Sequence, residues 1–507
     1  MGFNTVDWLV VFGYLALTTW IGHAMRGKQG TIKDFFLGGR SLPWIAVCGS
    51  IIATEISALT FIGVPAIVYA EGGDMRYLQW AIGSIIARFI VGIYFIRLFY
   101  KKQIFSPYDF MGNVLGEHAR RTTTILFWIG GILGQSVRVM VTAIILRAVT
   151  GIDANLCILL VGVFAVFWTL MGGMRTVIWT DVVQFIIFLV GGILSLVVLI
   201  SAAGGWGTFT DIAGQAGKLR VIDTSFSLTD QYILLVAIFA IPFQNVTAYG
   251  LDQLMAQRAF CCRDANEAGK AVMWSSVSQV ITLIMLLVGA GLYVFYKTNV
   301  MPDEMAERVA GERNLIFPLW ILDNLPVGVR GLIIAGAFAA AISSLDSILA
   351  ALSQTSISLF TKQEVIDADK GRLVFLSRMV VVGWGIALTA FTMILYITAR
   401  DTDLISLAFG MLAYTYGPLL GIFMLAVLGK RRSPGGILLG VGLSILFTLW
   451  TQEHLYQLLG WAFDMSAETA ATIRPDISWA WMFPISFLIT FACGYFFSKE
   501  LPDPVDG

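Results

Sequence analysis

A polar patch interrupts an otherwise apolar stretch of the sequence at residues 331–356. Residues that follow one another at the i, i+3, i+4, i+7 spacing share one face of a helix. The small and hydroxyl side chains at that spacing belong to Ala340, Ser343, Ser344 and Ser347. Asp346 stands at the edge of the same face. Oxygen atoms of this kind suit a hard cation, and no soft ligand lies among them.

Asp346 decides between two interpretations of this face. Small-residue stripes are typical of close helix packing, and a serine hydroxyl can bond to the backbone carbonyl four residues back. A carboxylate in the middle of a hydrophobic span is costly, however, and indicates a functional site with a partner. The acid therefore favours an ion site over a packing stripe.

A second acid, Asp181, lies about one turn into another apolar stretch, residues 177–202, with Gln184 three residues further on. An acid near a helix N-terminus can simply interact with the positive end of the helix dipole. The distant face of hydroxyl groups offers the other interpretation, in which Asp181 helps to bind a cation.

Arg138 stands near the middle of an apolar stretch at residues 124–149, too far from either end for its charge to reach the interface. It must therefore face a partner inside the protein. One hypothesis assigns its planar guanidinium to a carboxylate of the substrate. The other assigns it to a buried ion pair with Glu55. The further candidates for binding the substrate are Gln135, Thr60, Glu55, Gln244 and Asn245.

The composition is that of a polytopic membrane protein. Of 507 residues, 57% are hydrophobic and only 13% are charged, whereas soluble domains carry about 25% charged residues. The formal net charge of +0 implies no nucleic-acid partner. An enzyme has no support, because no HExxH, GxSxG or P-loop motif occurs. The three histidines, His23, His118 and His454, also lie far apart.

Thirteen apolar stretches have about the 20 residues that a membrane span needs. They fall near residues 6–25, 45–69, 77–99, 124–149, 156–173, 177–202, 231–256, 271–296, 331–360, 373–398, 403–428, 436–452 and 479–498. Every second loop is basic, which predicts that the N-terminus lies on the outer side of the cell membrane and the C-terminus on the cytoplasmic side. The basic side chains of those loops include Lys28, Lys101, Arg258, Lys362 and Lys430.

Two of the spans are interrupted by polar residues and prolines. The first contains Glu55, Thr60 and Pro65, and the second contains Pro242 and Asn245. Broken spans at matching places in two halves are typical of an inverted-repeat transporter. Unwound backbone at that depth is tolerated only inside protein or along a cavity. Proline kinks without function are the alternative interpretation.

The predicted organisation is therefore two five-span repeats with additional spans at both ends. The segments are a first span and inner loop (1–40), core repeat one (41–202), an outer loop (203–230), core repeat two (231–428), two C-terminal spans (429–498) and a cytoplasmic tail (499–507).

Five segments, in order along the chain, resemble the sodium:solute symporter family. GGMRTVIWTDVVQ, from Gly172 to Gln184, is similar to the family's signature, and SSLDS at residues 343–347 is similar to its sodium helix. The other three are DFFLGGRSLP, ATEISALTFIGVP and YGLDQLMAQR. The resemblance covers nearly the whole chain. It implies an all-α, leucine-transporter-type fold that works by alternating access, driven by sodium flowing inward.

The resemblance also implies where sodium binds. A first set of ligands would be the carbonyl groups of Ala53, Ile56 and Ala340 with the hydroxyls of Ser343 and Ser344. A second set, found in some members, would use Asp181, Ser343 and Ser347. We expect Asp346 to share that ion, because a bound cation would offset the repulsion between the two acids. The chain departs from the family's pattern at Asp346, where many members carry a small or hydroxyl residue, and at Glu55, where a neutral residue is common.

These features favour sodium-coupled import of a small organic solute by a monomer in the lipid bilayer. The run TFIGVPAIVY resembles the branch that carries monocarboxylates and other anions, so we expect a substrate with a carboxylate. Three alternatives stay open. They are a sodium-coupled sugar or polyol symporter, a proton-coupled permease that uses Asp346 and Glu55, and a sensor, for which we would expect an additional soluble output domain.

Overall fold

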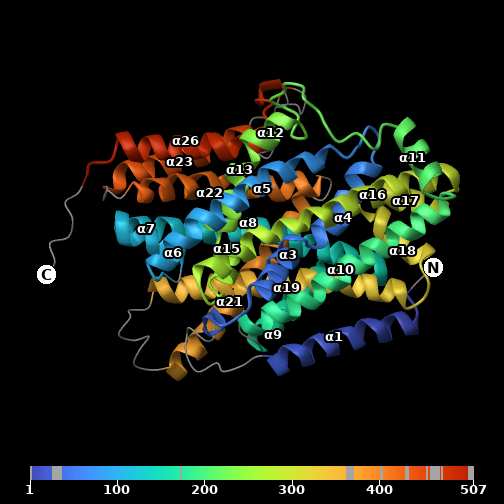
Figure 1. Cartoon of the computed structure of the whole chain (residues 1–507), viewed down its shortest axis with the longest axis horizontal. Coiled ribbons are helices and arrows are strands. Elements are labelled where there is room, and N and C mark those ends of the chain that lie inside the picture. Colours follow the sequence, from blue (N-terminus) through green and yellow to red (C-terminus); the bar gives the residue numbers. More distant parts are fainter. Residues whose placement is uncertain are drawn as a thin grey trace. The chain divides into compact units, whose positions relative to one another are not determined.

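The computed structural model of the chain is helical almost throughout the residues that it describes (Figure 1). These are residues 3–25, 37–104, 106–171, 174–360, 370–399, 403–428, 433–452, 455–456, 459, 469 and 472–500, without the side chains of 171, 339–341, 370–374 and 399. A bilayer core offers the backbone no hydrogen-bond partners, whereas a helix satisfies its backbone groups internally. The all-α membrane fold predicted from the sequence is confirmed.

Ten helices or continuous helical runs in the described part of the chain are long and apolar enough to cross a membrane, and two bent helix pairs add to them. The unbroken ones are α1 (Thr5–Met25), η2 to α6 (Arg76–Lys101), α8 (Glu117–Thr150), α10 (Met174–Ala202), α15 to α16 (Ala265–Thr298), α19 (Val329–Phe360), α21 (Lys370–Ala399), α22 (Leu404–Val427), α23 (Pro434–Thr451) and η6 with α26 (Trp479–Phe496). The remaining expected span corresponds to α9 (Ala154–Met171), whose described apolar part is shorter, so the number thirteen stays a prediction.

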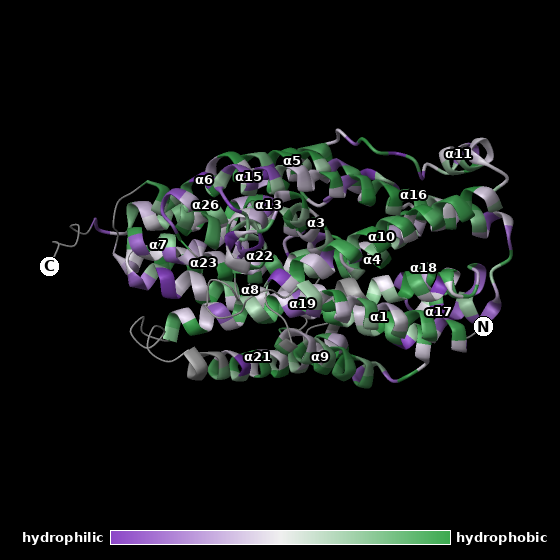
Figure 2. Cartoon of the chain, turned by 60° about the horizontal axis from the view of Figure 1, so that its bottom comes forward, coloured by the Kyte–Doolittle hydropathy of each residue, from purple (hydrophilic) through white to green (hydrophobic). Residues whose placement is uncertain are grey.

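Helix α10 illustrates how the sequence pattern determines packing. Its buried residues, from Val177 to Leu199, recur about every three to four positions and so form one stripe along the helix. Exposed apolar residues such as Ile186 and Val197 lie between them. In Figure 2 most of the ribbon of α10 and α16 has the colour of hydrophobic residues. One stripe therefore faces protein, and the apolar remainder suits lipid.

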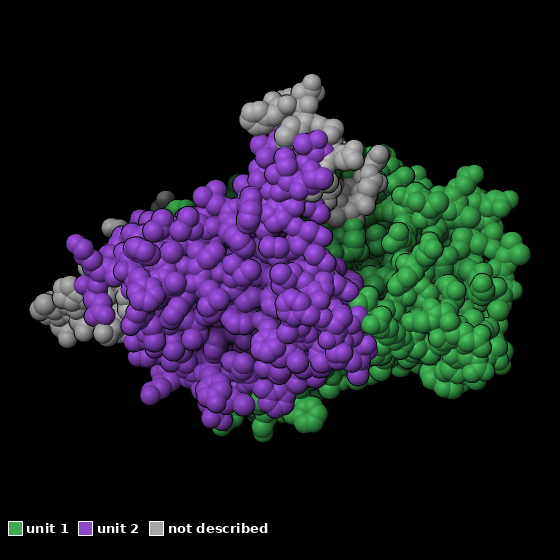
Figure 3. Space-filling model, turned by 90° about the horizontal axis from the view of Figure 1, so that it is seen from above, with its two compact units in different colours: residues 1–78, 135–221, 258–407 green, residues 79–134, 222–257, 408–507 purple. Residues whose placement is uncertain are grey.

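The helices gather into two compact units, which Figure 3 colours separately. Unit 1 comprises residues 1–78, 135–221 and 258–407, and unit 2 comprises residues 79–134, 222–257 and 408–507. Each unit draws segments from both predicted repeats. The division into two repeats therefore stays a prediction.

In unit 1, α10 packs against α1, α3 (Trp44–Glu55), α16 and α19. Helix α16 lies along α4 (Ala58–Tyr69), where Gly289 allows close approach, since a Cβ there would lie 2.5 Å from the Pro65 carbonyl oxygen. Helix α19 also packs on α9 and α21, and its apolar window is 93% buried. The short helices of this unit are η1 (Gly38–Arg40), α11 (Trp206–Gln215), α17 (Asp303–Gly311), η5 (Arg313–Leu315) and α18 (Ile316–Asn324). Polar residues on α19 are thus shielded from lipid.

In unit 2, α5 (Trp80–Ile90) packs against α12 (Leu234–Phe239) and α13 (Ile241–Gly250), and α23 packs against α26. Helix α5 continues through a π-helical turn, η3 (Val91–Phe95), into α6 (Ile96–Lys101). The rings of Trp80, Phe409 and Trp479 contact one another. The other short helices are α7 (Pro107–Leu115) and α14 (Gln253–Ala259).

The first bent pair, α3 with α4, turns by 54° at Ile56 and Ser57. The Ile56 amide donates to the Ile52 carbonyl as the last bond of α3, and the Ser57 hydroxyl caps α4 by accepting from the Leu59 amide at 3.3 Å. Pro65 lies further along, inside α4. The break therefore leaves the last carbonyls of α3 without continuation of the helical hydrogen bonding.

The second bent pair, α12–α13 with α14, turns by 60° around Asp252. Asp252 Oδ1 accepts from the Leu254 amide at 2.9 Å and so caps α14, while the Tyr416 hydroxyl donates to Oδ2 at 2.6 Å. Pro242 sits in the first turn of α13, where a proline is tolerated. Neither bend coincides with a proline, so the interpretation as simple proline kinks is wrong.

Some expectations concern residues outside the described part of the chain. These include the basic loop residues Lys28, Lys362 and Lys430, the glycines that open the signature run, His454 and the tail 501–507. The orientation derived from the basic loops stays a prediction.

Candidate ion and solute sites

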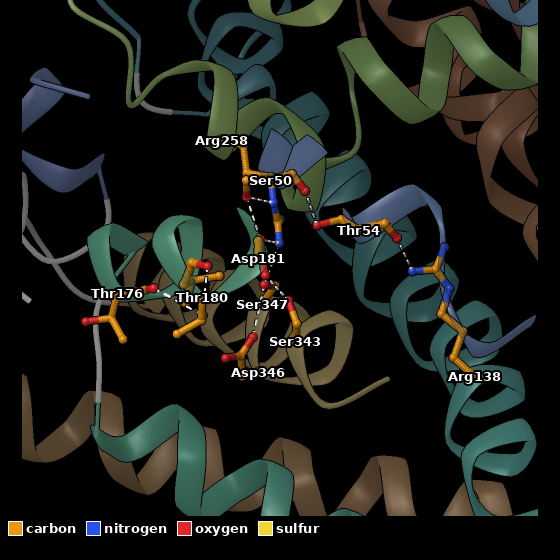
Figure 4. A network of polar contacts seen from close by, with 11 residues as sticks. Ser50, Thr54, Arg138, Thr176, Thr180, Asp181, Arg258, Ser343, Asp346 and Ser347 are labelled. Atoms are coloured by element: carbon orange, nitrogen blue, oxygen red, sulfur yellow. Dashed lines mark hydrogen bonds and ion pairs between the residues drawn. The ribbon is translucent and has the colours of Figure 1, made fainter. Parts of the chain in front are cut away.

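Asp181 lies on the buried stripe of α10 and receives hydrogen bonds from three other helices (Figure 4). The Ser50 hydroxyl of α3 donates to Asp181 Oδ2 at 2.5 Å, and the Ser343 hydroxyl of α19 donates to Oδ1. Nη2 of Arg258, from α14, lies 3.2 Å from Oδ2. The predicted convergence of Asp181 with the hydroxyl face of α19 is therefore present, since α10 packs directly on α19.

Arg258 belongs to this network, although its charge led to the expectation that it lies in a basic loop. It is fully buried, and besides Asp181 it contacts two hydroxyls, with Nε donating to Ser50 at 3.0 Å and Nη2 donating to Ser347 at 2.7 Å. Its assignment to a basic loop is wrong, because α14 continues to Ala259 and carries the guanidinium inward. Of the basic residues that follow, Arg263 is exposed. The apolar run AFCC directly after Arg258 is a sequence signal for burial.

Asp346 is joined to the same network through one hydroxyl. The Ser347 hydroxyl accepts from Arg258 and donates to Asp346 Oδ1 at 3.1 Å. Both Asp346 and Ser347 are buried. The four residues predicted as a second sodium set, Asp181, Ser343, Asp346 and Ser347, thus lie in one chain of hydrogen bonds, together with Ser50 and Arg258, which sequence reasoning did not assign to it.

The first predicted sodium set is divided between α19 and the segment around the break of α3 and α4, and α19 packs against both of these helices. Ala53 and Ile56 are buried at that break, and Ser343 and Ser344 are buried on α19. Ala340 lies within α19, but its side chain is outside the described residues. Carbonyl and hydroxyl oxygens are the ligands that a hard cation prefers, so this donor set fits sodium.

Arg138 lies beside the same break, in the part of α8 that belongs to unit 1. Its Nη1 donates to the Thr54 carbonyl oxygen at 3.1 Å. Glu55, the next residue, accepts a hydrogen bond from Gln279 of α16 at 3.2 Å. Sequence reasoning missed Gln279, because an amide near a helix start carries no distinctive signal. Both hypotheses for Arg138 therefore remain open.

The other predicted substrate residues are divided between the two units. Gln135, one turn before Arg138, is buried, and its Oε1 has no hydrogen-bond partner within the described residues. Thr60 is half-buried on α4. In unit 2, Asn245 of α13 donates to Gln244 Oε1 at 2.5 Å and accepts from the Ser84 hydroxyl of α5 at 3.0 Å. Four of the six residues therefore belong to unit 1 and two to unit 2.

Comparison with known proteins gives consistent matches. The model of the Sodium:solute symporter family matches residues 35–443. The sodium/sialic acid symporter SiaT of Proteus mirabilis (strain HI4320) is 28% identical over 487 residues, covering 94% of this chain and 96% of that protein. The sodium/sialic acid symporter NanT of Aliivibrio fischeri (strain ATCC 700601 / ES114) is 28% identical over 460 residues, covering 89% and 88%.

A solved structure of a Na+-coupled sialic acid symporter in a substrate-bound, outward-open state has the same fold. Its TM-score is 0.81 at 24% sequence identity, covering 98% of this chain and 100% of that one. The resemblance seen in the sequence motifs is confirmed, and with it the expectation of sodium-coupled transport of a small organic solute. The chain belongs to the sodium:solute symporter family.

Proposed function

We propose that this symporter imports a solute that carries a carboxylate, and that Arg138 binds the carboxylate. The position of Arg138 is the observation that supports this most. Its contact with the Thr54 carbonyl oxygen, at 3.1 Å, holds a cationic side chain at the break between α3 and α4. A guanidinium has five N–H donors in a planar fork, enough to hold a backbone carbonyl and a carboxylate together.

The relatives indicate what kind of acid to test first. Two of them are named sodium/sialic acid symporters, and sialic acids are sugar acids with one carboxylate and several hydroxyls. The amide of Gln135 and the hydroxyl of Thr60, which belong to unit 1 like Arg138, are groups that bind hydroxyls. A sugar acid therefore matches this set of predicted side chains better than a purely apolar acid does.

Sodium is the second substrate in this proposal. The first ion would be held by the carbonyls of Ala53, Ile56 and Ala340 and by the hydroxyls of Ser343 and Ser344. Asp181, Ser343, Asp346 and Ser347 would supply a second ion site. We also propose that the protein works as a monomer in the cell membrane, with the N-terminus outside and the C-terminus in the cytoplasm.

Thermal-shift measurements on the purified protein test the proposal. Sialic acid, other sugar acids, short carboxylates and neutral sugars are added with sodium or with choline. A ligand at 100 times its Kd stabilises the folded state by about 2.7 kcal/mol. We expect a sodium-dependent shift with an acid, loss of that shift in Arg138→Gln, and an unchanged response to sodium alone. Arg147→Gln is the matched control, because this arginine is half-exposed on the same helix.

A neutral sugar or polyol is the second candidate, and the position of Glu55 favours it. Glu55 follows Thr54, whose carbonyl binds Arg138, so a structural ion pair would use neighbouring residues. In that case Arg138→Gln leaves the half-buried Glu55 carboxylate without its cation and should lower the melting temperature. Recovery of folding and solute binding in Arg138→Gln with Glu55→Gln would contradict the carboxylate proposal and support a neutral solute.

A further inference from the structure

Arg258 lies inside the group of side chains predicted to bind a second sodium ion. We call Asp181, Ser50, Ser343 and Ser347 the Asp181 cradle. Nη2 of Arg258 contacts both Asp181 and Ser347, and Nε contacts Ser50 (Figure 4). The side chains of Arg258 and Asp181 are both 0% exposed. The cradle therefore already holds a cation that is part of the chain.

The hydrogen-bond directions show what this cation occupies. Each serine hydroxyl has one hydrogen and two lone pairs. Ser50 and Ser347 each direct their hydrogen to a carboxylate, Asp181 and Asp346 respectively, and accept an N–H of Arg258 with a lone pair. A sodium ion needs those same lone pairs and the same carboxylate oxygen. Guanidinium and sodium would also repel each other if both were bound to these shared ligands.

We propose that Arg258 and a sodium ion compete for the Asp181 cradle, so that Arg258 lowers the affinity of the second sodium. Arg258 thus acts on sodium binding by occupying the ligands that the ion needs. The proposal rests on the second sodium set proposed above and adds to it the group that must leave before the ion enters. The apparent affinity for an ion falls in proportion to the fraction of molecules whose site is vacant.

The contacts of Arg258 explain why it can be exchanged for an ion. Its partners in the cradle are two hydroxyls and one carboxylate, and all three can bind sodium after the guanidinium leaves. Hydroxyls also rotate to change which partner receives their hydrogen. Arg258 is close to the end of α14, which ends at Ala259.

Sodium titrations of the melting temperature test the competition. Wild type, Arg258→Gln, Asp181→Asn and the double variant are purified and titrated with sodium chloride at constant ionic strength, with choline as the replacement cation. The part of the sodium-dependent rise in melting temperature that is lost in Asp181→Asn measures sodium binding to the Asp181 cradle. We expect this part to half-saturate at about tenfold lower sodium in Arg258→Gln, which corresponds to a guanidinium that leaves the cradle one-tenth of the time. In the double variant we expect it to be absent.

Equal or weaker sodium affinity of the cradle in folded Arg258→Gln would overturn the proposal. So would an identical response of Arg258→Gln and the double variant, because the cradle would then bind no sodium. If Arg258→Gln does not fold, Arg258→Lys gives the same test. A lysine offers a point charge in place of the fork, so its cradle should bind sodium more tightly than wild type, and an unchanged affinity would refute the competition.

Two controls separate this proposal from the others. Arg147→Gln removes a half-exposed arginine and should leave the titration unchanged. Ser344→Ala acts on the first sodium set and should weaken the part of the response that does not depend on Asp181. If Ser344→Ala leaves the titration unchanged, the first sodium site is wrong. That result would not bear on the competition at Asp181, which is tested by the Arg258 variants.

Discussion

Two buried arginine–aspartate pairs in unit 1 differ in the kind of hydrogen-bond partner that surrounds them. Asp7 of α1 binds Nε of Arg330 at 2.7 Å and also accepts from the backbone amides of Gly328, at 2.8 Å, and Asn4, at 3.1 Å. Nη1 of Arg330 donates to the Leu322 carbonyl at 2.9 Å. Asp181 and Arg258, in contrast, are surrounded by side-chain hydroxyls.

The difference separates a fixed ion pair from an exchangeable one. The backbone amides that bind Asp7 can only donate, so these partners of the carboxylate offer no lone pair to a cation. Serine hydroxyls can donate, accept or coordinate a cation. We infer that the Asp7–Arg330 pair attaches α1 to the start of α19, whereas the Asp181–Arg258 pair is part of the ion-binding machinery.

The largest expected effect is that of Arg330→Gln. It leaves a buried carboxylate without its cation, which costs about 3–5 kcal/mol of the free energy of unfolding. We expect sodium to restore less of this loss than it does at Asp181, because the other donors to Asp7 are backbone amides, whereas those to Asp181 are serine hydroxyls that can also bind a cation. Melting curves in sodium and in choline measure it. If sodium raised the melting temperature of Arg330→Gln as much as it raises that of Arg258→Gln, the two pairs would not differ in this way.

Ser50→Ala tests the bridging hydroxyl of the exchangeable pair. Its loss leaves Asp181 and Arg258 each without one hydrogen-bond partner, which we expect to cost about 1–3 kcal/mol. The same change should weaken the Asp181-dependent response to sodium. Ser195→Ala on α10 is the control, because within the described residues that buried hydroxyl bonds to the Gly191 carbonyl of its own helix. Equal effects of the two changes would assign Ser50 a packing role alone.

Smaller effects are expected for the two hydroxyls of the first sodium set. Ser343→Ala and Ser344→Ala each remove one of about five oxygen ligands, and we expect about a tenfold rise in the sodium concentration for half-maximal uptake. Ser343→Ala should also alter the Asp181-dependent response, since Ser343 donates to Asp181, whereas Ser344→Ala should not. Unchanged sodium dependence in both variants would contradict the assignment of this face.

The smallest effect concerns Lys218, a buried cation outside the spans whose ammonium donates to the backbone carbonyls of Ala70 and Gly73. Burial lowers the pKa of Lys218 below its usual value, although Asp74 and Glu71 oppose the shift. The folded protein then loses this proton at lower pH than the unfolded chain does, so stability rises with pH from the folded pKa up to about 10.4.

In Lys218→Met this alkaline contribution should be absent. The measurement is the difference in melting temperature between wild type and Lys218→Met from about pH 8 to about pH 10.5, which should change in favour of wild type as pH rises. A constant difference would show that the lysine is as well solvated in the folded protein as in the unfolded chain.

The two pairs also show what the sequence could predict. Asp181, Ser343 and Ser347 were expected to meet because the resemblance to the family implies a shared ion site for them. Both helix breaks were predicted from their polar residues. Arg258 was misassigned because it stands near the end of a span, where a charge usually marks a loop. The anchoring of Arg138 on Thr54 could not be predicted, since a backbone carbonyl has no sequence signal.

Uptake of sialic acid into proteoliposomes tests the central claim most directly. An inward sodium gradient or an inward proton gradient is imposed separately, and sialic acid competes with its amide, which lacks the charge. We predict uptake that requires the sodium gradient, ignores the proton gradient at fixed sodium and is inhibited by the acid much more strongly than by the amide. Uptake driven by the proton gradient in choline, or equal inhibition by acid and amide, would contradict the account.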